Sequence, residues 1–277
     1  MSKSKTFFQK CYIIVKAKTW PLRPVETIYT EMEESISLER PRRRKLPKLR
    51  DNSRRARTLI LVFWIFIAIT VIAVISDYLE LQLLKRIMFG ALVTEETTEA
   101  NDLRQGVMGI LQTGIYIATV IVFLLWFGRA YANLGRLGVR LQHKRGMAFY
   151  AWIIPFACLF WPVQIMKEIW SKTQGVIRKK DPFYIISSGS LAIGFWWLLF
   201  VFSNFIGRYV FKTLWNAETI EDYIRSTEAY LVSDLLQIPE ALLVIFIVSR
   251  VSGMENRMLE EVYGKERSLT QEIEITD

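Results

Sequence analysis

The chain has 277 residues, of which 52% are hydrophobic and 23% are charged, and its formal net charge is +9. Apolar stretches occupy most of residues 59–249, which suits a small helical membrane bundle and excludes a soluble enzyme with a single membrane tail. Two cysteines, Cys11 and Cys158, are too few for a disulfide framework. A single histidine, His143, does not make a metal site, so no metal is expected.

The first 56 residues (1–56) are predicted to be a basic cytoplasmic arm, because residues 1–58 hold 16 of the 36 Lys and Arg. Within this arm, residues 7–18 place apolar side chains on one helical face among lysines. This pattern indicates either a short helix on the membrane surface or a disordered tail. A basic patch lies just before the first apolar stretch, where it either enforces topology or binds anionic lipid. Its members are Arg42, Arg43, Arg44 and Lys45.

Residues 57–250 are predicted to form an all-α, polytopic membrane bundle, since a spanning helix needs about 20 mostly apolar residues. Four apolar stretches are long enough to cross the bilayer: 59–76, 106–128, 185–206 and 230–249. A fifth stretch, 146–166, contains Pro155 and Pro162, which break or kink a helix. We therefore expect four spanning helices plus one proline-broken segment, re-entrant or kinked. Residues 251–277 are expected to be a charged C-terminal tail.

The distribution of Lys and Arg favours a re-entrant course for residues 146–166. If this segment returns to its own side, the cytoplasmic parts hold 30 Lys and Arg against 6 outside. If it crosses, the chain has five spans, the C-terminus is outside, and the count becomes 24 against 12. The positive-inside rule thus favours four spans with both termini in the cytoplasm. A kinked crossing stays open, because the 21 residues of this segment are long enough to span the bilayer.

Two motifs stand in the central region. The first reads Arg129-Ala-Tyr131-Ala-Asn133-Leu134. The second begins at Pro155 and continues through Pro162, Gln164, Met166 and Glu168 to Trp170.

With these motifs, the chain resembles over about residues 57–252 the bacterial multi-pass membrane family called domain of unknown function 4328. Cys158 and Trp161 depart from the Asn and the basic residue expected at those positions. The resemblance implies a helical membrane fold and a bacterial inner-membrane location. It implies no reaction, substrate or partner.

The first motif predicts a polar pair at the cytoplasmic face. Arg129 and Asn133 are four residues apart and share a face if the second span continues as a helix. Glu168 lies on a polar face that begins after Pro162, a residue suited to the first turn of a helix. We expect Arg129 to pair with Glu168. The alternative is a solvated basic helix end that only obeys the positive-inside rule.

Glu240 is the most unusual residue of the last span, because it lies near the expected bilayer midplane. An ionisable group at this depth is costly unless it is paired or neutral, and it marks a functional site by default. Ser233 and Gln237 share its helical stripe, and Gln112 and Tyr116 form a second polar stripe on the 106–128 span. The two stripes predict a polar seam between helices. The alternative is structural, since such hydrogen bonds also hold membrane helices together.

No catalytic motif is recognisable, so an enzyme is not expected and no cofactor is implied. The first functional hypothesis is a non-enzymatic membrane partner, scaffold or regulator. The alternative is a small transporter or channel with a polar intramembrane site around Glu240. The expected partners are the lipid bilayer and either another membrane protein or a second copy of the chain. Nucleic acid is not expected, because the basic cluster directly precedes a span.

Overall fold

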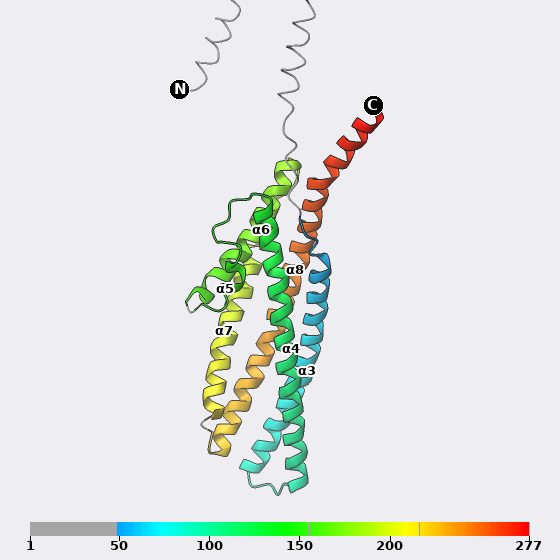
Figure 1. Cartoon of the computed structure of the whole chain (residues 1–277). Coiled ribbons are helices and arrows are strands. Elements are labelled where there is room, and N and C mark those ends of the chain that lie inside the picture. Colours follow the sequence, from blue (N-terminus) through cyan, green and yellow to red (C-terminus); the bar gives the residue numbers. More distant parts are fainter. Residues whose placement is uncertain (1–48, 155, 216, 277) are drawn as a thin grey trace, which may run out of the picture. The chain divides into compact units, whose positions relative to one another are not determined.

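The computed structural model describes residues 49–154, 156–215 and 217–276, and every regular element within these ranges is a helix. Four long helices form a bundle: α3 (Ser53–Met88), α4 (Glu95–Arg136), α7 (Ser190–Trp215) and α8 (Ile220–Thr276). α8 packs against both α3 and α7, and α3 also packs against α4, each pair running antiparallel (Figure 1). The predicted surface helix and the basic patch at residues 42–45 lie outside the described residues.

The four helices confirm the predicted polytopic, all-α membrane fold. Each is long and apolar enough to cross a bilayer. Large apolar side chains face outward along them, including Trp64 and Ile72 on α3, which are 51% and 56% exposed. In a bilayer this outward apolar surface contacts lipid, so its exposure is compatible with a stable fold. The predicted C-terminal tail is a direct continuation of α8 as far as Thr276.

The proline-broken segment contains no continuous spanning helix. Residues 146–166 comprise the short helix α5 (Met147–Tyr150), the 3-10 turn η2 (Ala157–Leu159) and the start of α6 (Trp161–Lys180). Phe156 adopts a left-handed φ of 64° within this turn region. Pro162 stands in the first turn of α6, where its missing N–H costs no helical hydrogen bond.

The two ends of the broken segment lie next to each other. His143 Nε2 is 3.1 Å from Gln164 Oε1, so the chain leaves α4 and comes back to the same level of the bundle. Arg145 also donates a hydrogen bond to the backbone carbonyl of Gly135 at the end of α4. This geometry corresponds to the returning course, and the kinked continuous helix does not form.

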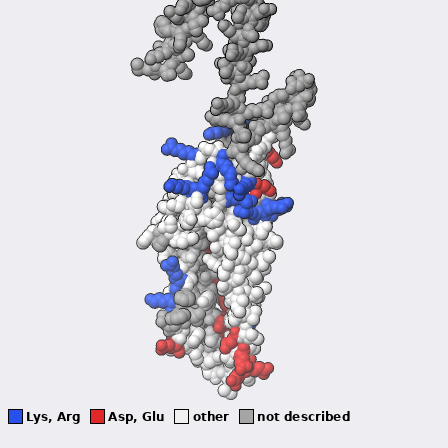
Figure 2. All heavy atoms as spheres, viewed as in Figure 1, with Lys and Arg blue, Asp and Glu red and all other residues white. Residues whose placement is uncertain are grey.

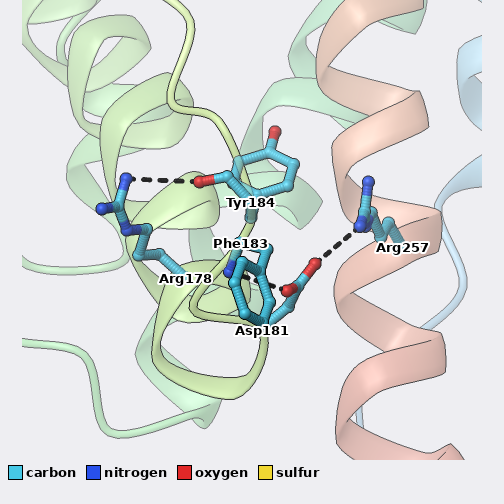
Figure 3. Close-up of polar contacts among 5 residues, drawn as sticks. All are labelled: Arg178, Asp181, Phe183, Tyr184 and Arg257. Atoms are coloured by element: carbon cyan, nitrogen blue, oxygen red, sulfur yellow. Dashed lines mark hydrogen bonds and ion pairs between the residues drawn. The ribbon is translucent and has the colours of Figure 1, made fainter.

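The turn after α6 is fixed to the C-terminal half of α8 (Figure 3). Arg257 on α8 forms an ion pair of 2.8 Å with Asp181, and its guanidinium lies 4.9 Å from the centre of the Tyr184 ring. Asp181 also accepts the backbone N–H of Phe183, and Arg178 donates to the Tyr184 carbonyl. These contacts hold the α6–α7 connection beside α8.

Charged side chains separate toward the two ends of the bundle (Figure 2). Most Lys and Arg gather at the end where α4 finishes and α3 begins, and Asp and Glu gather at the end that carries the α3–α4 turn. The acidic end carries Glu95 and Glu96 in the first turn of α4. This separation agrees with a membrane protein whose basic end faces the cytoplasm.

Single cysteines test the returning course of the broken segment. With Cys11 and Cys158 replaced by Ser, a cysteine at Lys144 or Lys179 should resist an impermeant maleimide added outside intact cells. A cysteine at Glu96 should be labelled and serves as the positive control. All three side chains are exposed, so protection reports the side of the membrane and not burial. Labelling at position 179 together with protection at 144 would instead demonstrate a crossing between them.

Candidate functional site

A cavity of about 790 Å³ lies among α3, α4, α7 and α8 and is hereafter called the polar cavity. Four carboxyl groups line it, two from α3 and two from α8: Asp77, Glu80, Asp234 and Glu240. Asn204 and Arg208 on α7 also line it and are exposed, so the cavity opens to the surroundings. Acidic atoms are visible along the seam between the helices (Figure 2).

The two polar stripes expected from the sequence meet in this cavity. Gln112 on α4 donates a 2.6 Å hydrogen bond to Asp234 on α8. Gln237 donates to the other oxygen of Asp234 at 3.1 Å and approaches Ser233 at 3.4 Å. Tyr116 lines the same cavity. The centre of the seam is thus the buried Asp234, which lies within the last apolar stretch beside the expected stripe.

The end of the polar cavity nearest the α3–α4 turn is organised by Gln105 on α4. Its side-chain amide donates to Glu80 and, at 3.4 Å, to Asp77, both on α3. The neighbouring Arg104 instead donates to Ser76 and Asn101. Within the described part of the chain, no Lys or Arg forms an ion pair with any of the four cavity carboxyl groups.

Glu240 lies at the junction of the polar cavity with a second cavity of about 320 Å³. This second space is hereafter called the aromatic chamber, because six of its lining residues are Phe or Trp. They are Phe63, Phe66, Phe123, Trp152, Trp196 and Phe200. Trp152 comes from the broken segment and packs edge-on against Phe123 of α4 and Phe200 of α7. Sequence reasoning missed this chamber, since its aromatic residues come from segments far apart in the chain.

The expected pair of Arg129 and Glu168 is wrong. Glu168 is buried and accepts a 2.7 Å hydrogen bond from the Tyr131 hydroxyl and further bonds from the backbone N–H of Gln142. Arg129 donates to the backbone carbonyl of Asp51, on the opposite side. Tyr131 and Glu168 both belong to the predicted motifs. Tyr131 lies two residues after Arg129 on α4, so its side chain turns toward α6 and that of Arg129 does not.

Asn133 ties the chain entering α3 to the bundle. Its side chain exchanges two hydrogen bonds with the backbone of Arg50, accepting at 3.2 Å and donating at 2.8 Å. Next to it, the buried Asn52 donates to Glu255 on α8 and to the Trp126 carbonyl. Asp51, between them, accepts the backbone N–H of Ser53, and this hydrogen bond lowers its pKa. These side chains are structural ties around residues 49–53.

The described residues contain no group of three or more His, Cys, Asp or Glu side chains placed to hold a metal ion. His143 contacts the Trp161 ring and Gln164. The polar cavity is therefore lined by carboxyl and amide groups, and the rings of the aromatic chamber lie beside them.

Removal of the Tyr131 hydroxyl tests the corrected partner of Glu168. Tyr131→Phe should lower the free energy of unfolding by about 1.5–3 kcal/mol, the usual range for a hydrogen bond to a charged group. The measurement is an SDS-induced unfolding titration in mixed micelles. Tyr150→Phe, at an exposed tyrosine of α5, is the matched control and should leave stability unchanged. Arg129→Gln should cost less than Tyr131→Phe, and a reversed order would restore the predicted Arg129 pair.

A family model described as Domain of unknown function (DUF4328) matches residues 90–253. The matched region runs from before α4 into α8 and holds both motifs and most of the polar cavity, whereas α3 precedes it. No curated protein and no solved structure matches the chain. Because the matched region spans more than half of the sequence, the chain belongs to the family Domain of unknown function (DUF4328).

Proposed function

We propose that this protein is a small, non-enzymatic membrane transporter that takes a cationic solute into the polar cavity. The observation that carries the proposal is the cavity itself, whose four carboxyl groups form no ion pair with a Lys or Arg of the described residues. Amide side chains bond to three of these groups but carry no opposite charge, and a bound cation offsets the cost of holding carboxylates within the membrane. Ligand sites between the helices of bundles have volumes of about 300–1,000 Å³, which includes the volume seen here.

The backbone hydrogen bonding of α8 is interrupted directly beside Glu240. Pro239 precedes Glu240 inside α8 and cannot donate a hydrogen bond to the carbonyl of Leu235. Transporters commonly build their sites where a helix is interrupted near the bilayer midplane. We infer that α8 bends at this position when the cavity changes its access.

We further propose that the protein resides in a bacterial inner membrane with its basic end in the cytoplasm. The separation of charge between the two ends of the bundle supports this orientation. On this proposal the end of the polar cavity that contains Asp77 and Glu80 faces the outside of the cell. Four helices enclose only a narrow pathway for a solute. Assembly of several copies of the chain would enlarge the space that is shielded from lipid.

A second candidate function is that of a membrane-anchored partner or regulator. α8 favours it, because its 57 residues span about 85 Å at 1.5 Å per residue. The hydrocarbon core of a bilayer is only about 30 Å thick. The helix thus carries its charged C-terminal part well beyond the membrane, where another protein can dock. Co-purification of a stoichiometric partner that is lost when residues 265–277 are removed would support this function.

Flux measured in proteoliposomes tests the transport proposal. Wild-type protein should accelerate the entry of labelled tetramethylammonium over empty vesicles. Asp234→Asn should fold, because an amide can still bond to Gln112 and Gln237, but should reduce entry at least tenfold since the charge is lost. Glu228→Gln is the matched control, because Glu228 is half-exposed and pairs with Lys85 outside the cavity. Wild-type vesicles that behave like empty ones would contradict the proposal.

A further inference from the structure

The aromatic chamber and the polar cavity share part of their walls. Three of the residues that line both spaces are Tyr116 on α4, Gln237 on α8 and Glu240 on α8. The carboxyl group of Glu240 therefore faces acidic and amide groups on one side and stacked rings on the other. A ligand placed at Glu240 has room for a polar part and an apolar part.

The chamber wall is a connected group of rings from three segments. Trp152 of the broken segment contacts Phe123 at 5.5 Å between ring centres, and Phe123 contacts Trp196 of α7 at 6.0 Å. Trp196 is nearly fully buried and lies 6.5 Å from Phe200. Aromatic faces are negative, so they attract a cation as well as stack on flat apolar groups.

We propose that the solute is an amphipathic organic cation, whose charged nitrogen lies against Glu240 while its apolar body fills the aromatic chamber. This inference rests on the proposed function and adds the chemical class of the solute. A bare inorganic cation needs oxygen ligands and has no use for six aromatic rings. In the described part of the chain the acidic groups do not form a metal-binding set either. A chamber of about 320 Å³ is large enough for a compact ring system.

The chamber can be filled without changing any charge. Val244 lines the chamber and is 4% exposed, so Val244→Phe inserts a ring into the space that the apolar body would occupy. Leu242, two residues earlier on α8, is 43% exposed and lines neither cavity. Leu242→Phe therefore adds a ring to the same helix and is the matched control.

The experiment compares two probes on the full chain in lipid nanodiscs by equilibrium dialysis, with empty nanodiscs subtracted. Benzyltrimethylammonium carries one apolar ring beside its charged head, and tetramethylammonium has the head alone. We expect wild-type protein to bind benzyltrimethylammonium at least tenfold more tightly. Val244→Phe should weaken benzyltrimethylammonium at least tenfold and leave tetramethylammonium unchanged, and Leu242→Phe should change neither. Glu240→Gln should weaken both probes.

The possible failures are distinguishable. Binding of tetramethylammonium with equal or weaker binding of benzyltrimethylammonium would overturn the amphipathic solute and leave the cation transporter standing. Binding of neither probe would overturn both. If Val244→Phe fails to fold, Thr119→Leu fills the same chamber from α4. Unchanged benzyltrimethylammonium affinity in a folded chamber variant would overturn the inference.

Discussion

The hydrocarbon interior of a bilayer offers no hydrogen bonds, so every backbone N–H and C=O inside it must find a partner within the protein. The four long helices meet this constraint by their own geometry. The broken segment meets it with short-range backbone hydrogen bonds in successive turns, such as those from Ala151 to Met147 and from Cys158 to Ile154. Side chains add ties to the neighbouring helices: Arg145 binds the Gly135 carbonyl of α4, and the Trp197 indole of α7 donates a 3.0 Å hydrogen bond to the Leu159 carbonyl. These two bonds attach the segment to α4 and α7.

The same constraint explains the composition of the polar cavity. Asp234 is 4% exposed, and two amide side chains, from Gln112 and Gln237, bond to its carboxyl oxygens. Gln112 links the carboxyl group on α8 to α4, whereas Gln237 bonds to it from three residues further along α8 itself. Bonds of this kind contribute about 0.6 kcal/mol each in membrane bundles. These hydrogen bonds can therefore join helices while carboxyl oxygen atoms still face the polar cavity.

Much of the architecture could be predicted from the sequence, because a bilayer imposes length and charge rules on single segments. The four spans and the returning course of residues 146–166 both followed from such rules. Partner identity did not follow, because helical spacing tells which residues share a face and not what that face meets. For that reason Glu168 was assigned to Arg129 when its partner is Tyr131. Glu240 lines the polar cavity together with Ser233 and Gln237 of its stripe, but spacing alone did not assign the buried Asp234 to this seam, and the aromatic chamber depends on contacts between distant segments.

Trp152 gives the broken segment a mechanical consequence. Its ring packs against Phe123 on α4 and against Trp197 and Phe200 on α7, while the segment on either side is anchored to the helices. A group that enters the chamber and displaces this ring must also push the loop outward or spread the two helices. The segment continues directly into α6, and Asp181 at the far end of α6 forms an ion pair with Arg257 of α8. Displacement of the Trp152 ring would therefore also disturb α6 and this ion pair.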